Sequence, residues 1–150
     1  MGMFLGIDAA ASGLTAERLR MDVISNNLAN INTTRTEEGG AYKRKYVVFK
    51  PREADPTSFE SVLSRITNRP TPGTGVRAVA IEADQSEGIM VYDPGHPDAN
   101  ADGYVEKSNV NVVAEMVDMI TASRAYEANT TVINAAKSMI TKALEIGGNR

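Results

Sequence analysis

The sequence predicts a mainly α fold with a small β-rich insert. Apolar residues recur every seven positions near both ends of the chain, which is typical of helices that pack along one seam. No Gly or Pro interrupts residues 110–146, whereas all six prolines fall within residues 37–107. Pairing the two helices would hide both seams. We therefore expect the long N- and C-terminal helices to pair as an antiparallel coiled-coil-like hairpin.

The expected domains follow from this pattern. Residues 1–36 and 108–150 would form one discontinuous helical assembly domain, and residues 37–107 a β-rich and loop-rich insert. A two-helix hairpin buries little surface by itself and leaves apolar residues beside the seams exposed. The helical domain is therefore expected to complete its burial against other chains.

The N-terminal helix is predicted from a heptad pattern in which the companion positions of the seam are apolar except for Glu17. Asp8 or Ser12 would cap the start of this helix, and Asn32 would end it. The residues spaced by seven are Ile7, Leu14, Met21 and Leu28, and their apolar companions are Met3, Ala10, Ile24 and Ile31.

The C-terminal helix is predicted from the same spacing. Asn109 or Asn111 would cap its start, and Gly147 and Gly148 would end it. The apolar residues at sevens are Val112, Met119, Tyr126, Ile133 and Ile140; positions three or four later hold Met116, Ala122, Ala136, Ala143 and Leu144.

The insert is predicted to hold strands at residues 41–50, 75–84 and 88–93, because these stretches are rich in β-branched or aromatic residues and are bounded by turn residues. Residues 57–70 fit either a short amphipathic helix or a mobile loop between two prolines. Residues 51–74 as a whole match no recognised pattern, which is typical of a variable surface loop.

Three asparagines in the N-terminal helix, Asn26, Asn27 and Asn30, are unexpected because Asn is a poor helix former. On a helical projection Asn26 and Asn30 lie opposite the seam and Asn27 lies at the flank, so the three amides would form a polar patch on the face that the hairpin leaves free. The simpler explanation is a solvated face. We favour a contact between subunits, since uncharged amides can be buried there at lower cost than charges.

The composition excludes several classes of function. The chain has no Cys and a single His, His96, which removes disulfides, zinc–thiolate sites, cysteine nucleophiles and most His-based sites. A net charge of −3 argues against binding to nucleic acid. The basic stretch at residues 42–46 is better explained as an exposed strand face or a subunit contact. No apolar span long enough for a membrane helix occurs, and no cleaved signal is recognisable.

One segment imitates a calcium loop. Asp98, Asn100, Asp102 and Gly103 match positions 1, 3, 5 and 6 of an EF-hand, but position 12 is Asn109 instead of Glu. We expect a turn-rich loop in which these side chains bond to local backbone groups. No metal, cofactor or catalytic residue is expected.

Three stretches carry a resemblance to a known family: "SNNLANINTTRT" at residues 25–36, "YKRKYVVFK" at 42–50, and "YDPGHPDANADGYVEKSNVNVVAEMVDMITASRAYEAN" at 92–129. The chain resembles the flagellar basal-body rod proteins over residues 3–50 and 75–148. The family pattern usually has Pro where this chain has Ser108.

The resemblance implies a structural subunit of the proximal rod, without catalysis, in a tubular structure that transmits torque. It implies contacts with copies of itself, with other rod proteins and a basal adaptor, and with the flagellar type III export apparatus. It also implies location in the periplasm-spanning rod of the basal body, after export without a cleaved signal peptide. A coiled-coil adaptor or a needle-like component of a type III secretion apparatus is the alternative.

The residues expected at subunit contacts are the three asparagines Asn26, Asn27 and Asn30, together with Ile7, Leu14, Met21, Leu28, Val112, Met116, Met119, Tyr126, Ile133, Ile140 and Leu144.

Overall fold

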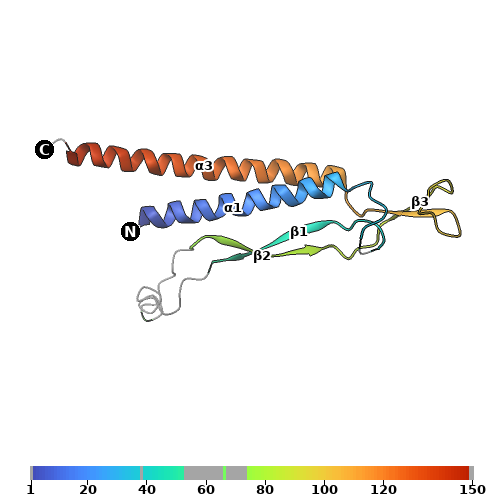
Figure 1. The fold of residues 1–150 in the computed structure, drawn as a ribbon. Coiled ribbons are helices and arrows are strands. Elements are labelled where there is room, and N and C mark those ends of the chain that lie inside the picture. Colours follow the sequence, from blue (N-terminus) through green and yellow to red (C-terminus); the bar gives the residue numbers. More distant parts are fainter. Residues whose placement is uncertain (1, 38, 53–65, 67–73, 149–150) are drawn as a thin grey trace. The chain divides into compact units, whose positions relative to one another are not determined.

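The computed structural model describes residues 2–37, 39–52, 66 and 74–148 (Figure 1). Its elements, in chain order, are α1 (Gly2–Ala29), β1 (Lys45–Pro51), β2 (Val76–Ala83), β3 (Ile89–Tyr92), β4 (Tyr104–Lys107) and α3 (Val112–Gly148). β1 pairs with β2 and β3 pairs with β4, as two separate two-stranded sheets. The two long helices pack together, so the predicted mainly α fold with a small β insert is confirmed.

Most predicted elements are present. The three strands expected in the insert correspond to β1, β2 and β3, whereas β4 was not predicted. α1 ends just before the predicted Asn32, and α3 continues through both terminal glycines to Gly148, the last described residue. The helix or loop expected at residues 57–70 lies outside the described residues except for Ile66, which is in a helical conformation.

The chain forms two compact units, and each contains parts of both long helices. The first unit comprises Met1–Arg18, Phe49–Val79 and Arg124–Arg150, and the second comprises Leu19–Val48 and Ala80–Ser123. Each unit thus joins helix segments that are far apart in the sequence to strand residues of the insert.

In the first unit, α1 approaches both α3 and the start of β2. A Cβ atom placed on Gly13 would lie 2.8 Å from Nδ2 of Asn129, so the two helices are close at this point. Ser12 Oγ donates a hydrogen bond to Ala9 O and accepts one from Val76 N at 3.0 Å. Ser12 therefore lies within α1 and fixes β2 there; its predicted role as a helix cap is wrong.

The predicted cap Asp8 is also inside α1. Its Oδ2 forms an ion pair with Arg52 Nη1 at 3.4 Å, at the end of β1. Beside this pair, Arg52 N donates to Gly75 O at 2.9 Å. Gly75 has φ +108°, and a Cβ there would overlap Ser12 Oγ. Only glycine therefore allows β2 to begin so close to α1.

The second unit contains the β3–β4 ribbon, whose strands are antiparallel with Val91 opposite Val105 and Tyr92 opposite Tyr104. Side chains alternate between the two faces of a strand. Val105 is almost fully buried on one face, whereas Tyr92 and Tyr104 are exposed on the other. The ribbon thus packs into the unit with one face and leaves an aromatic face open.

The buried positions of the helices coincide with only part of the predicted seam. On α3 the most buried apolar residues are Ala122 and Ala136, two of the predicted companion positions, whereas Val112 and Tyr126, at the seven-residue spacing, are exposed. Small side chains at the centre let the helix approach its neighbours closely, and the large apolar side chains are displaced to the margins. On α1 the buried apolar residues are Ala10, Ala16, Val23 and Ile24, while Ile7, Leu14, Met21 and Leu28 are half-buried.

None of the helices that the structure describes has a stretch long and apolar enough to cross a membrane.

Candidate functional site

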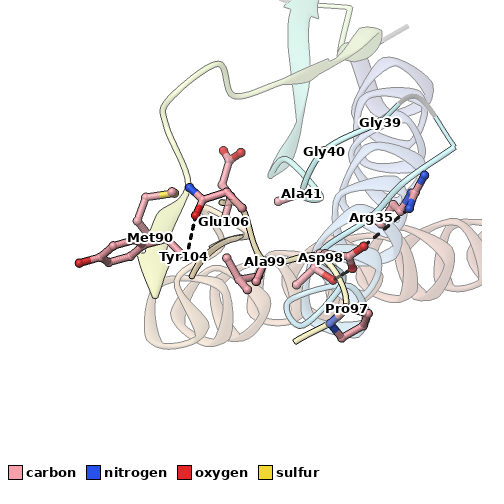
Figure 2. A pocket seen from close by; sticks show the side chains of 13 residues that line it. Arg35, Gly39, Gly40, Ala41, Met90, Pro97, Asp98, Ala99, Tyr104 and Glu106 are labelled. Carbon is pink, nitrogen blue, oxygen red and sulfur yellow. Dashed lines mark hydrogen bonds and ion pairs between the residues drawn. The ribbon is translucent and has the colours of Figure 1, made fainter. Parts of the chain in front are cut away.

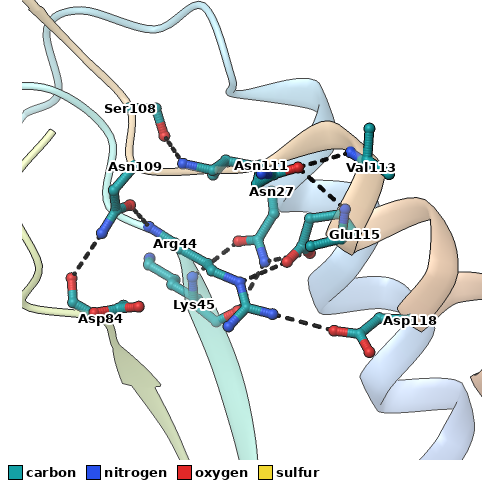
Figure 3. A network of polar contacts seen from close by, with 12 residues as sticks. Asn27, Arg44, Lys45, Asp84, Ser108, Asn109, Asn111, Val113, Glu115 and Asp118 are labelled. Carbon is teal, nitrogen blue, oxygen red and sulfur yellow. Dashed lines mark hydrogen bonds and ion pairs between the residues drawn. The ribbon is translucent and has the colours of Figure 1, made fainter. Parts of the chain in front are cut away.

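Asn27 of α1 is fully buried within the second unit and uses all its hydrogen-bonding capacity (Figure 3). Its Nδ2 donates to Lys45 O at 2.8 Å and to Glu115 Oε2 at 2.9 Å. Its Oδ1 accepts from Lys45 N at 2.9 Å and from the Tyr42 hydroxyl at 3.1 Å. The predicted position of Asn27 at the flank of a free face is wrong: this amide joins α1, the start of β1 and α3 inside the chain.

Glu115, in the first turn of α3, is also fully buried. Arg44 Nε donates to Glu115 Oε1 at 2.5 Å, and Arg44 Nη2 reaches Asp118 Oδ2 at 3.2 Å. The hydrogen bond to Glu115 raises the pKa of Arg44 above its ordinary value. Asp118 Oδ1 also contacts Arg20 Nη2 at 3.5 Å. A buried carboxylate is tolerated only when it is paired and hydrogen-bonded, and Arg44 and Asn27 meet that requirement.

Tyr42 and Arg44 belong to the basic stretch for which an exposed strand face or a subunit contact was expected. Tyr42 is instead buried, with its hydroxyl on Asn27, and Arg44 is directed towards α3. Burial and the negative charge of Glu115 raise the pKa of Tyr42 above 10.0. The expectation of an exposed face is therefore wrong for these two residues, although Lys43 and Lys45 are exposed.

Asn109 connects the segment before α3 to the insert. Its Oδ1 accepts from Arg44 N at 2.7 Å, and its Nδ2 donates to Asp84 O at 3.2 Å and Ser86 Oγ at 2.9 Å. Two residues later, Asn111 Oδ1 accepts from the N–H groups of Val113 and Ala114 at 3.0 and 3.2 Å. The predicted helix cap is therefore Asn111, and Asn109 holds the entry to α3 against the strands (Figure 3).

Sequence reasoning missed this polar junction of Asn27, Tyr42, Arg44, Asn109 and Glu115. A signal was available for Glu115, which is the only charged residue between Asn109 and Asp118. A lone carboxylate in an apolar stretch of helix suggests a buried partner. Its partner Arg44 was hidden among other basic residues, so no local pattern could identify it.

The calcium-like segment forms the expected turn-rich loop. Asn100 Oδ1 accepts from the N–H groups of Asp102 and Tyr104, and Asp93 Oδ1 accepts from Gly95 N. Asp98 Oδ2 accepts from Thr34 Oγ1 at 2.9 Å, which ties this loop to the segment after α1. In the described part of the chain, no group of three or more His, Asp or Glu side chains is placed to hold a metal ion.

A cavity of about 590 Å³ lies beside this loop, between residues 34–35 and 39–41 on one side and the β3–β4 ribbon on the other (Figure 2). Its charged groups include Arg35 and Asp98, whose Nη1 and Oδ1 are 3.8 Å apart. Met90 and Tyr104 contribute apolar surface to its wall. The cavity has neither a buried nucleophile nor an acid–base pair among these lining residues.

A row of large apolar side chains on α3 faces solvent. Val113, Val117 and Ile120 are between 57% and 71% exposed, and Met116 beside them is about half exposed. Their spacing of three or four residues places them on one face of the helix. We call these four residues the α3 row. Large exposed apolar patches on a protein surface mark interaction sites.

The two other asparagines differ from Asn27. Asn26 is exposed, as predicted from the helical projection, and its Nδ2 donates to Asp22 O at 3.3 Å. Asn30 is half-buried; its Nδ2 donates to Asn26 O at 2.9 Å and its Oδ1 accepts from Thr33 Oγ1 at 3.2 Å. Both amides satisfy nearby groups where α1 ends.

Comparison with known proteins identifies the class. Residues 7–35 match the family model described as flagella basal body rod protein, and residues 101–146 match that of the flagellar basal body rod FlgEFG protein C-terminal region. The two matches cover much of α1 and α3 together with β4. The class is thus that of the flagellar basal-body rod proteins.

Full-length relatives define the family more narrowly. The flagellar basal-body rod protein FlgC of Borreliella burgdorferi is 51% identical over 97% of this chain and 98% of its own length. FlgC of Bacillus subtilis is 46% identical over 98% of this chain and 99% of its own, and FlgC of Salmonella typhimurium is 38% identical over 93% and 94%. The chain belongs to the FlgC family of flagellar basal-body rod proteins. It is a structural subunit of the flagellar basal-body rod and not an enzyme.

Proposed function

We propose that this rod subunit is part of the proximal rod, where it binds copies of itself and other rod proteins through its terminal helices and builds a tubular shaft that transmits torque. The observation that carries this proposal is the α3 row of Val113, Met116, Val117 and Ile120. A monomer gains nothing from exposing such a row, whereas a rod subunit buries it against a neighbour.

We further propose that α1 and α3 pair as an antiparallel coiled-coil-like hairpin. Within the second unit, Arg20 contacts Asp118 and Asn27 contacts Glu115. The residue numbers on α1 rise as those on α3 fall, which supports an antiparallel arrangement there. This pairing leaves the outer faces of both helices available to other subunits.

The residues proposed for subunit contacts divide according to their exposure. Val112, Met116, Tyr126 and Leu144 are exposed and are available for direct contacts. Asn26 is available in the same way, and Asn30 in part, whereas Asn27 is not, because it is fully buried. The half-buried members, which can contribute only their outer edges, are Ile7, Leu14, Met21, Leu28, Met119, Ile133 and Ile140.

Location in the periplasm-spanning rod, binding to a basal adaptor, and export through the flagellar type III apparatus without cleavage are parts of the same proposal. They are supported by membership of the rod family.

The proposal is tested in cells that lack this protein and are complemented with variants. Ile120→Glu places a charge in the α3 row without altering a buried position, so we expect a folded subunit that is not incorporated. The matched control, Ile120→Leu, keeps the side chain apolar and is expected to restore motility. Electron micrographs of isolated basal bodies report the rod directly. Intact rods in cells without any copy of the protein would refute the proposal.

A further inference from the structure

The second unit carries another exposed apolar face besides the α3 row. Met90, Tyr92 and Tyr104 on the β3–β4 ribbon are between 43% and 65% exposed. Met90 lies opposite Glu106, and Tyr92 opposite Tyr104. Because side chains alternate along a strand, these four residues share one face. We call Met90, Tyr92 and Tyr104 the ribbon face.

The two tyrosines of the ribbon face pack against each other. Their ring centroids are 5.3 Å apart with an interplanar angle of 65°, the edge-to-face arrangement favoured by aromatic pairs. The Tyr92 ring lies over Gly103, where an added Cβ would be 3.0 Å from Cε2. Gly103 has φ +80° and accepts a hydrogen bond from Asp93 N at 2.9 Å. Aromatic side chains that are already ordered lose little entropy when they bind.

We propose that the α3 row of one subunit packs against the ribbon face of a second copy of the same chain. Both surfaces present large uncharged side chains, and Tyr and Met are enriched at the centres of protein interfaces. Glu106 lies at the edge of the ribbon face, where its Oε1 accepts from Gly88 N at 3.4 Å. A charge at the edge of an interface stays hydrated and does not oppose the contact.

Two other occupants of the α3 row fit less well. Packing against the same row of a second copy would be isologous and would close at two subunits, whereas a rod needs contacts that continue. The outer face of α1 in this unit contains exposed Asp22 beside Asn26, and an apolar partner would strip water from that carboxylate without pairing it. A contact with the ribbon face continues from copy to copy, and the carboxylate beside Met90, that of Glu106, already accepts a hydrogen bond from Gly88 N.

This contact is heterologous, because it joins two different surfaces of identical chains. Each subunit offers one α3 row and one ribbon face, so the contact repeats from subunit to subunit and does not terminate. The inference rests on the proposed assembly of copies into a rod, and it assigns the surfaces that meet.

Crosslinking tests the contact directly, because the natural chain has no Cys. Cells carry the full chain with both Met90→Cys and Val117→Cys, and isolated basal bodies are treated with a short bismaleimide. We expect a ladder of dimers, trimers and longer products. Each single variant alone should give none, and co-expression of the two single variants should give dimers that do not extend. The control pair Met90→Cys with Ser138→Cys, another exposed position on α3, should stay monomeric.

Four results would overturn the inference. Dimers from Val117→Cys alone would show that two α3 rows contact each other. Crosslinked products from a chain with Asn26→Cys and Val117→Cys would show that the α3 row packs against α1 of the second copy. Linkage of the row to a different axial protein would exclude a second copy as its occupant. If basal bodies contain the double variant without any crosslink, the inference fails and the proposed function stands. Absence of the wild-type chain from basal bodies would refute the proposed function itself.

A charge exchange gives a second readout that does not depend on crosslinking. Val117→Glu should reduce swimming to the level of the deletion strain, and adding Met90→Lys should restore part of it, because the two new charges would face each other. The control strain carries Met90→Lys and Ile120→Leu and keeps Val117. We expect this strain to swim poorly. Circular dichroism of each purified chain checks that folding is preserved. Failure of Met90→Lys to improve swimming in the Val117→Glu strain would count against the contact.

Discussion

Asn27 of α1 donates a hydrogen bond to Glu115 of α3 at 2.9 Å, and neither side chain reaches solvent. A directional polar bond between two helices has one favourable register, because sliding either helix leaves a buried amide or carboxylate without its partner. The large apolar side chains nearby would tolerate several registers. This pair therefore selects one arrangement of α1, β1 and α3 within its unit.

The first prediction compares two neighbouring asparagines. Asn27→Leu should lower the free energy of unfolding by about 2–4 kcal/mol, because it leaves Glu115 and both backbone groups of Lys45 short of a partner. Asn26→Leu, at an exposed position, should change it by no more than about 0.5 kcal/mol. Urea unfolding followed by circular dichroism measures both. Equal effects would contradict the assigned role of Asn27.

The second prediction concerns Arg44, which contacts Glu115 and Asp118 with different nitrogens. Arg44→Lys keeps the charge but cannot bridge both carboxylates, so we expect a loss of about 1–3 kcal/mol in urea unfolding. Lys43→Arg at the exposed neighbour is the control and should be nearly neutral. Wild-type stability of Arg44→Lys would mean that the fork geometry is unimportant.

The third prediction separates Asn109 from Asn111. Asn111→Asp should be tolerated, since a carboxylate caps a helix at least as well as an amide. Asn109→Asp should destabilise the chain, because a carboxylate cannot donate to Asp84 O or to Ser86. Asn111→Ala should cost about 1 kcal/mol. Thermal unfolding of the three variants tests this order. A larger loss of stability in Asn111→Asp than in Asn109→Asp would contradict the roles given to these two residues.

The fourth prediction is a pH dependence. Burial and the charge of Glu115 raise the pKa of Tyr42 in the folded chain, whereas the unfolded chain keeps the ordinary value of 10.0. The folded chain holds this proton more tightly, so the stabilisation is complete below pH 10.0 and is lost as the pH rises through the raised pKa.

Tyr46 also has a raised pKa, through its hydrogen bond to Glu82, so the measurement uses the Tyr46→Phe background. There, the free energy of unfolding should fall as the pH rises above 10.0. Adding Tyr42→Phe should make this fall shallower, since the group responsible is then absent. If the free energy of unfolding falls equally with pH with and without Tyr42→Phe, then the pKa of Tyr42 is the same in the folded and unfolded chain, and the prediction is wrong.

The fifth prediction concerns the first unit. Gly75→Ala combines an unfavourable positive φ with overlap on Ser12, whereas Gly40→Ala has a positive φ of 78° and no neighbouring atom within 4 Å. Gly40→Ala should cost about 1 kcal/mol. Gly75→Ala should cost at least twice as much, because Ser12 Oγ must move from Val76 N. Similar losses of stability would mean that β2 is not held tightly against α1.

Local patterns predicted the helices, three of the four strands in the described part of the chain, the cap at Asn111 and the exposure of Asn26, because each depends on near neighbours in the chain. They located the helix contact only in part. Of the predicted seam on α3, the companion positions Ala122 and Ala136 are buried, whereas Tyr126, at the seven-residue spacing, is exposed. Apolar periodicity marks a broad stripe on a helix, and which part of it is buried depends on the partner's shape.

The sequence by itself determined that this chain is mainly helical, that its two helical segments lie at opposite ends of the chain, and that it resembles the rod family. Only the tertiary structure decided that Asn27 faces inward, that Glu115 is paired with Arg44, and that two separate apolar faces stay open in the second unit. Secondary structure follows from hydrogen bonds and side chains a few residues apart. A buried polar pair depends on residues 71 positions apart in the chain, and no local pattern contains that information.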